Sequence, residues 1–461
     1  MDASSPHSGH QSVVLKKYPY RQLEYDEFRL VEIQPADDDS MAVKCLIQHL
    51  PRLSSGSVDY IALSYTWGDL ALLKQVAIDT SYYLEVSANC YAALRRFRSK
   101  EKTVLVWIDA MCINQEDVEE RTKQVRKMGQ IYTSASQVLV YLGDEADDSG
   151  RIFEHIQGVC SRRPVNGYPT ARLRNLDLGR HCDEGLIKIA WAIMRRPWFS
   201  RVWVLQEVFL GVKGKADVVV VCGPHSASLK DLANCCEVLC SEVGEKMEYV
   251  SEIPYVLTIA AGGTPRGLHD ILRRTRHANA TDPRDKFLGL LAMVDDERVS
   301  NIAGYHMNTT TVYTQVGLFL LQSVQLELLQ SIRHPHSRYP NLASWMPDWS
   351  CTEDSGQSQE IQHAGHDCDY RPTLQVRDCC RSSSHSSSSD HEYHPVLKVK
   401  GFKVSRIESL GEAFNFLGDR EECLVALKSL SESVNRPLTP HLPGGFTPDS
   451  RHISKAEGET G

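Results

Sequence analysis

The feature that most constrains this fold is an alternation of strand-like and helix-like segments between Tyr60 and about Cys222. Three runs of β-prone residues, IALSY (61–65), TVLVWID (103–109) and VLVYLG (138–143), are separated by segments with helical patterns. The run at 103–109 is almost continuously apolar, as is typical of a strand covered on both faces. This alternation favours a parallel sheet with helices on both faces. We therefore predict an α/β fold in which these three strands lie side by side.

The helical segments are recognised by N-terminal capping residues and by apolar faces. Ser87 is a suitable N-cap for a helix over 87–97. A second helix is predicted over 118–132, where apolar residues recur on one face and Glu119 and Lys123 form a pair four residues apart on the other. A helix over 184–194 and a strand over 216–223 continue the alternation. The core domain is therefore expected to end near residue 223.

The segments on either side of this domain differ in composition. FRLVEI (28–33) and AVKCLI (42–47) are separated by a turn-rich stretch and are predicted to form a hairpin. Beyond the domain the pattern is mainly helical with some β structure, including LKVKGFKVSRI (397–407). The expected divisions are a disordered N-terminus (1–12), a β-hairpin lead-in (13–59), the core domain (60–223), a mainly helical region (224–435) with a low-complexity loop (381–391), and a disordered tail (436–461).

Composition excludes several classes of protein. The formal charge of −8 and pI near 6.1 give no overall attraction to phosphate backbones, so no nucleic acid partner is expected. The longest apolar runs, such as 287–294, fall short of the roughly 20 residues that a membrane helix needs. The N-terminus has no basic start followed by a long apolar run, and the 14 cysteines are scattered. We expect a cytoplasmic protein with free thiols and no membrane span.

Three segments carry uncommon residues in a fixed order. They are YIALSYTWGD (60–69), VWIDAMCINQED (106–117) and RPWFSRVWVLQEV (196–208). In sequence and order they resemble the three conserved blocks of the heterokaryon-incompatibility (HET) domain family of fungi. A weaker resemblance continues into TDPRDKFLGLLAM (281–293) and LASWMPDWS (342–350). The central resemblance covers about a third of the chain.

The resemblance implies a fungal signalling protein that acts in non-self recognition, programmed cell death or defence, a form of innate immunity. It implies partners among other HET or receptor-type proteins and homo-oligomer formation on activation. The spacing of Trp203 and Glu207 is also similar to that in Toll/interleukin-receptor (TIR) domains, where the glutamate of NAD-cleaving members is catalytic. By this resemblance Glu207 is expected to be the catalytic residue of an NAD glycohydrolase, with NAD as the substrate and no cofactor required.

The chemistry of such a site is plausible on its own terms. Cleavage of nicotinamide from ribose passes through an oxocarbenium-like state, and a fixed carboxylate beside the ribose stabilises the developing positive charge. In an open parallel sheet, ligands bind beyond the carboxyl ends of the strands. The loops after the strands at 61–65 and 103–109 therefore open on one edge. The expected substrate-binding residues on these loops and beside Glu207 are Tyr65, Trp67, Gly68, Asp69, Asp109, Asn114, Gln115, Arg201, Trp203 and Gln206.

Each of these assignments has a structural alternative. Trp67 can be a core anchor and Asp69 a helix cap. Glu207 can form a buried salt bridge with Arg201 or another basic residue and hold its helix in place. The chain is then a non-enzymatic module that passes on a death signal through protein contacts, or a divergent accessory protein. A Glu207 that faces an open cleft beside Trp67 and Asp109 favours the enzyme, whereas a Glu207 buried against an arginine favours the module.

Three other segments are not expected to carry chemistry. Cys112 has no histidine near it in its motif, so a nucleophilic role is not predicted. HAGHDC (363–368) lacks a second pair of ligands at zinc-binding spacing, so no metal site is expected. RRTRH (273–277) is interpreted as a solvated helix face.

Overall fold

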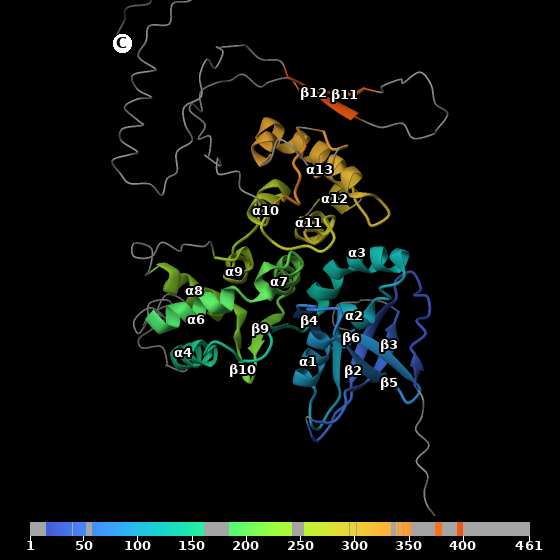
Figure 1. Cartoon of the computed structure of the whole chain (residues 1–461), viewed down its shortest axis with the longest axis vertical. Coiled ribbons are helices and arrows are strands. Elements are labelled where there is room, and N and C mark those ends of the chain that lie inside the picture. Colours follow the sequence, from blue (N-terminus) through green and yellow to red (C-terminus); the bar gives the residue numbers. More distant parts are fainter. Residues whose placement is uncertain are drawn as a thin grey trace, which may run out of the picture. The chain divides into compact units, whose positions relative to one another are not determined.

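The computed structural model describes most of the chain up to residue 351 and one later hairpin (Figure 1). The described ranges are 15–51, 58–160, 184–241, 253–332 and 338–351, apart from single positions at 39, 295, 301, 340 and 344, with the strands at 374–379 and 394–399. The predicted disordered ends (1–12 and 436–461), the low-complexity loop (381–391) and the segment 363–368 lie outside the described residues.

A mixed sheet organises the residues before 229. Within the described ranges it contains ten strands in the order β1-β6-β5-β3-β2-β7-β4-β8-β9-β10. Their bounds are β1 (Lys16–Lys17), β2 (Phe28–Ile33), β3 (Lys44–Leu50), β4 (Ile61–Tyr65), β5 (Leu73–Ile78), β6 (Tyr82–Ser87), β7 (Val104–Trp107), β8 (Gln137–Tyr141), β9 (Asp217–Cys222) and β10 (His225–Ser228).

The half of the sheet that carries the motifs is parallel. β4 pairs in parallel with β7 on one side and with β8 on the other, and β8 pairs in parallel with β9. In this register Ile61 lies opposite both Val106 and Gln137. The predicted α/β fold, with the strands at 61–65, 103–109 and 138–143 side by side, is confirmed.

The other half of the sheet is mixed. The predicted hairpin is present, because β2 and β3 are antiparallel with Phe28 opposite Leu50. β2 also pairs antiparallel with β7, so the hairpin belongs to the same sheet as the motifs. The sequence analysis did not anticipate β6, which pairs antiparallel with β5, or β10, which pairs antiparallel with β9.

Helices flank this sheet, as the alternating pattern predicted (Figure 1). The hydroxyl of Ser87 accepts a hydrogen bond from the amide of Cys90, which confirms the predicted helix cap. The side chain of Asp117 caps α3 by accepting from the amides of Glu119 and Glu120. The helices before β10 and the one directly after it are α1 (Ala88–Phe97), α2 (Asp109–Cys112), α3 (Val118–Ser134), α4 (Gly150–Cys160), α6 (Glu184–Met194), the 3₁₀ helix η1 (Pro197–Ser200), α7 (Val204–Lys213) and α8 (Leu229–Ser241).

Two hydrophobic cores pack against the parallel strands. Val140 and Val220 belong to one core, whereas Leu139, Tyr141 and Val221 belong to the other. Successive side chains of a strand point to opposite faces, so both faces of β8 and β9 are buried. This burial explains why the sequences of these strands are almost continuously apolar.

The region after α8 is mainly helical, as predicted. The apolar run FLGLLAM is divided between α11 and the 3₁₀ helix η2 instead of forming one long helix. Here the helices are α9 (Tyr255–Ala260), α10 (Leu268–Arg274), α11 (Asp285–Leu288), η2 (Leu291–Met293), α12 (Glu297–Ser300), α13 (Thr309–Val324) and the 3₁₀ helix η3 (Gln325–Ser331). β11 (Leu374–Cys379) and β12 (His394–Val399) form an antiparallel hairpin.

The prediction that RRTRH is a solvated face is wrong for Arg276. Arg273 and Arg274 are exposed, but Arg276 is only 3% exposed. Its guanidinium donates to the carbonyl oxygens of Ser331 at 2.6 Å and of Asp348 and Cys351 at 2.9 Å. A guanidinium has five N–H donors, so one buried arginine can satisfy several carbonyl groups of separate segments.

The described part of the chain lacks two features that would point to particular partners. It contains no helix with the length and apolar character needed to cross a membrane. Over the same residues, no group of three or more His, Cys, Asp or Glu side chains comes together in a way that could hold a metal ion.

Candidate functional site

The candidate site is built around the carboxyl end of β4. Ser64, the fourth residue of this strand, is 1% exposed. Its hydroxyl donates a hydrogen bond to Oε2 of Glu207 and accepts one from the indole nitrogen of Trp198 at 2.8 Å. Ser64 belongs to the first motif, and Trp198 and Glu207 belong to the third. The two motifs therefore meet through one buried hydroxyl.

Glu207 is a buried carboxyl in the first turn of α7. It is 4% exposed, and burial raises its pKa to about 7. The positive charge of Arg201 and the hydrogen bond from Ser64 lower this pKa, whereas the nearby charge of Asp109 raises it. Protonated and ionised forms of Glu207 therefore coexist near neutral pH. A buried carboxyl with a strongly raised pKa is a candidate functional group, although buried structural carboxyls can have the same property.

Arg201 holds the backbone at the end of β4. Its guanidinium donates to the carbonyl oxygen of Tyr65, the last residue of the strand. In the described residues no ion pair joins Arg201 to Glu207, although the charge of Arg201 still acts on the carboxyl. The structure therefore shows a nearby arginine but not the direct salt bridge that the structural alternative for Glu207 invoked.

The loop after β4 has a defined conformation. The indole nitrogen of the half-buried Trp67 donates to Oδ2 of Asp109 at 2.8 Å, which links the first motif to the second. Gly68 has a φ of +74°, and a Cβ at this position would lie 2.7 Å from Nδ2 of Asn89. Asp69 accepts from the amide of Ala71 at 2.8 Å, so its carboxylate caps a turn and not a helix.

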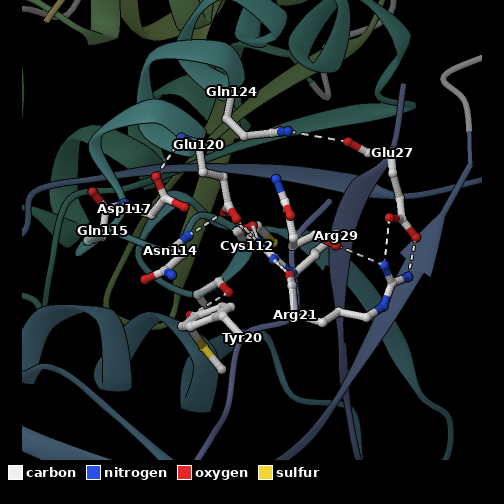
Figure 2. A network of polar contacts seen from close by, with 12 residues as sticks. Tyr20, Arg21, Glu27, Arg29, Cys112, Asn114, Gln115, Asp117, Glu120 and Gln124 are labelled. Carbon is white, nitrogen blue, oxygen red and sulfur yellow. Dashed lines mark hydrogen bonds and ion pairs between the residues drawn. The ribbon is translucent and has the colours of Figure 1, made fainter. Parts of the chain in front are cut away.

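The second motif is held by a buried ion pair, which Figure 2 shows. Arg29, fully buried on β2, contacts both carboxylate oxygens of Glu120 at 2.6 and 3.1 Å and donates to the carbonyl oxygen of Cys112. Oε1 of Glu120 also accepts from the amide of Asn114 at 2.7 Å. Gln115 donates to the carbonyl oxygen of Asp109 at 2.9 Å. The polar groups of Asn114 and Gln115 thus support the fold of their own loop.

Two residues of the third motif have unexpected surroundings. The indole nitrogen of Trp203 donates to Oδ2 of Asp285 at 3.1 Å, so its polar edge faces a later segment of the chain and not the loop after β4. Gln206 is 1% exposed, and its side-chain nitrogen has no hydrogen-bond partner among the described residues.

Burial also explains why the Cys112 thiol is not expected to act as a nucleophile. The side chain is 1% exposed, and desolvation raises the pKa of its thiol to about 12. A thiolate is the nucleophilic form of cysteine, so this environment suppresses reactivity.

The structure thus brings part of the predicted site together. The charges of Arg201 and Asp109 act on the pKa of Glu207, Arg201 binds the backbone of Tyr65, and Trp67 binds Asp109. A substrate-binding role for any of these residues stays a prediction. Sequence reasoning missed Ser64 and Trp198, although both lie inside the motifs. It also missed Arg29, whose signal is a charged residue between the apolar residues Phe28 and Leu30 of a strand.

The fold and the site together define an α/β domain in which three motifs meet around a buried carboxyl, at the carboxyl end of β4. The family described as "Heterokaryon incompatibility protein (HET)" matches residues 60–207, which extend from the start of β4 to Glu207. Residues 60–207 of this chain are therefore identified as a HET domain.

A curated relative extends the similarity beyond the domain. The chain is 25% identical over 460 aligned residues to the Neurospora crassa protein "Heterokaryon incompatibility protein 6, OR allele". The alignment covers 83% of this chain and 64% of that relative, so this chain spans less than two thirds of the relative's length. No solved structure matches the chain.

Proposed function

We propose that this HET-domain protein acts in fungal non-self recognition and programmed cell death. The proposal is supported by the match to the HET family over residues 60–207 and by the relative named for heterokaryon incompatibility. We further propose that it acts in the cytoplasm with other HET or receptor-type proteins and that it self-associates on activation.

The chemical step that we propose is cleavage of NAD, with Glu207 as the catalytic residue. The observation that carries this proposal is a buried carboxyl of pKa about 7 at the carboxyl end of β4, where parallel sheets bind ligands. The bond between ribose C1′ and the nicotinamide nitrogen breaks, and its electron pair stays on the leaving nicotinamide. The ionised carboxylate stabilises the oxocarbenium-like ribose, water adds at C1′, and a proton is released to give ADP-ribose.

The burial of Glu207 makes this activity conditional. At 4% exposure the carboxyl contacts Ser64 and has little access to a substrate. A substrate reaches it only if α7 or the loop at 66–69 moves. We propose that self-association supplies this movement, so that the single chain is inactive and the assembled chain cleaves NAD.

A non-enzymatic assembly module is the second candidate. The same burial favours it, because Glu207 is enclosed and the charge of Arg201 lies close to it. In this case the site fixes α7 against β4, and the domain transmits its signal through protein contacts alone.

Nicotinamide release separates the two candidates. The full chain is incubated with NAD over a range of protein concentrations, beside Glu207→Gln and the control Glu116→Gln, whose carboxylate is exposed at the surface and pairs with Lys17. For the enzyme, Glu207→Gln lowers release by about 100-fold or more, because a preorganised charge is lost. Release by the unchanged chain should rise as the pH passes through about 7, since only the ionised carboxylate stabilises the cation.

Two results would contradict the enzymatic proposal. One is a folded Glu207→Gln variant that releases nicotinamide as fast as the unchanged chain. The other is an absence of release at every concentration at which the unchanged chain self-associates, which favours the assembly module.

A further inference from the structure

Trp203 connects the helix that carries Glu207 to a segment beyond the HET match. It is the residue immediately before α7, and its carbonyl oxygen accepts the hydrogen bond of the Glu207 amide at 3.2 Å. Its indole nitrogen donates to Asp285 at 3.1 Å. Asp285 lies outside residues 60–207. The first turn of α7 is therefore held in part by a side chain from the later helical region.

Asp285 accepts two hydrogen bonds from different segments. While Oδ2 binds Trp203, Oδ1 accepts from the hydroxyl of Tyr305 at 2.5 Å. The side chain is 9% exposed, and burial raises its pKa to about 6, against the lowering effect of these two bonds. The guanidinium carbon of Arg121, on α3, lies 4.5 Å from the centroid of the Tyr305 ring. Through Tyr305 the carboxylate is thus also connected to the helix that follows the second motif.

Backbone contacts from the same segment fix the chain just before Trp203. Arg201 and Asn279 form a parallel β-bridge, and the amide of Val202 donates to the carbonyl oxygen of Asn279 at 3.0 Å. The ammonium group of the buried Lys286 donates to the carbonyl oxygens of Arg276 and Ala278, which precede Asn279. The start of α7 is consequently held both by a backbone bridge and by the Asp285 side chain.

Close packing leaves little freedom at this contact. A Cβ added at Gly289 would lie 3.3 Å from Cγ1 of Val202 and 3.4 Å from Cδ2 of Trp203. α11 and its C-terminal glycine therefore pack directly on the residues that begin α7. A shift of α11 would displace Trp203, and the Glu207 amide is bonded to Trp203.

We infer that Asp285 is a positioning residue for the Glu207 site: it holds Trp203, and Trp203 sets the start of α7 so that Glu207 meets Ser64. The inference deepens the proposed function and depends on it only for the chemistry that Glu207 performs. It also gives the region after the HET match a role, because that region supplies a contact on which the geometry of the site depends.

Asp285→Asn tests this inference in the full chain. The amide keeps the size of the side chain but removes its negative charge and one of its two acceptor oxygens, so Trp203 and Tyr305 can no longer both donate to it and the charge-assisted bond from Trp203 is lost. The matched control is Asp296→Asn, because Asp296 lies in the same region but forms an exposed ion pair with Arg298 at 2.7 Å. The readout is the carboxyl ¹³C signal of Glu207 across pH, assigned by its absence in Glu207→Gln, together with amide hydrogen exchange of α7.

We expect Asp285→Asn to shift the titration midpoint of Glu207 by about half a pH unit or more, because the distance to Ser64 and Arg201 changes. Exchange of the first α7 amides should accelerate by about tenfold or more, since a lost hydrogen bond to a charged group favours local opening. Asp296→Asn should leave both readouts unchanged.

Two outcomes would overturn the inference. In one, Asp285→Asn leaves the Glu207 titration and the exchange of α7 as they are in the unchanged chain. In the other, exchange accelerates equally in β2 and α8, which makes Asp285 a general stabiliser. If Asp285→Asn does not fold, Trp203→Phe removes the indole N–H while keeping an aromatic ring at the contact, and the same shifts are expected.

Nicotinamide release by the same proteins separates failure of the inference from failure of the proposed function. A shifted Glu207 titration in proteins that never release nicotinamide supports the positioning role and contradicts NAD cleavage. An unchanged titration and an unchanged kcat in Asp285→Asn, in an active protein, contradict the positioning role alone.

Discussion

Glu120 and Glu207 are both buried glutamates that contact strands of the sheet, yet their surroundings differ. Glu120 pairs with the fully buried Arg29 and accepts a hydrogen bond from the amide of Asn114 (Figure 2). Glu207 accepts one hydrogen bond from Ser64, and burial raises its pKa to about 7. Removing one partner of a buried ion pair leaves an uncompensated charge in the core, whereas a buried carboxylate without a full counter-charge itself costs stability when it ionises. The comparison therefore favours a structural role for Glu120 and makes Glu207 the candidate for a chemical role.

The same substitution at the two glutamates should have opposite effects, and the larger is at Glu120. Glu120→Gln leaves the charge of Arg29 buried without its partner, which should lower the free energy of unfolding by about 3 to 5 kcal/mol. Denaturant unfolding measures this loss. Glu116→Gln, which removes one partner of an exposed ion pair, should change stability by at most about 1 kcal/mol. Equal effects of the two substitutions would remove the distinction between buried and exposed pairs.

Glu207→Gln should stabilise the protein above neutral pH. Because the pKa of Glu207 is raised to about 7 from the ordinary 4.5, the folded state binds more protons than the unfolded state between these values. Stability due to this group is therefore greatest at the acidic end and falls as the pH rises, by about 1.4 kcal/mol per unit at most. The variant lacks this loss and should be up to about 3 kcal/mol more stable at pH 8.

The difference in free energy of unfolding between the two proteins, measured from pH 5 to 8, checks this prediction. The raised pKa of Asp285 contributes to both proteins and cancels in the difference. A variant that is less stable than the unchanged chain at every pH would place Glu207 with Glu120 as a structural residue.

Ser64→Ala should remove both hydrogen bonds of the Ser64 hydroxyl, the one to Glu207 and the one from Trp198. The indole nitrogen of Trp198 loses its acceptor, and an unsatisfied buried donor should cost about 2 kcal/mol in the free energy of unfolding. The pKa of Glu207 should rise further, because the hydrogen bond from Ser64 lowers it. Thermal unfolding and the Glu207 carboxyl ¹³C titration measure the two effects. An unchanged titration would show that Ser64 does not set the ionisation of Glu207.

Gly68→Ala should have a smaller effect, confined to the loop after β4. Its φ of +74° costs a residue with a Cβ about 1 to 2 kcal/mol, and the added atom would meet Nδ2 of Asn89 at 2.7 Å. Gly158→Ala is the control, because a Cβ added at this position in α4 would meet no described atom within 4 Å and should stabilise the helix by about 0.5 to 1 kcal/mol. Equal stability of Gly68→Ala and the unchanged chain, measured by thermal unfolding, would contradict a constrained loop.

Sequence reasoning located the parallel strands because each is a β-prone, mostly apolar run and segments with helical patterns separate them. It did not predict β6 or β10, since YYLEVS and HSAS have mixed polarity and pair at the antiparallel parts of the sheet. It misread Arg276, because a basic run gives no sign that one of its members turns inward to bind carbonyl groups of residues 55 to 75 positions later. Such contacts depend on long-range packing, which local periodicity does not encode.

By itself the sequence determined the family, the α/β class and the two loops in which polar residues gather, because motif order and hydrophobic period are local properties of the chain. Only the tertiary structure decided which polar groups meet. In the folded chain the indole of Trp203 donates to Asp285, Arg29 forms an ion pair with Glu120, and the buried Glu207 accepts a hydrogen bond from Ser64. The physical reason is that the ionisation and role of a carboxyl depend on the donors and charges within a few ångströms, and here these come from segments up to 143 residues apart in the chain.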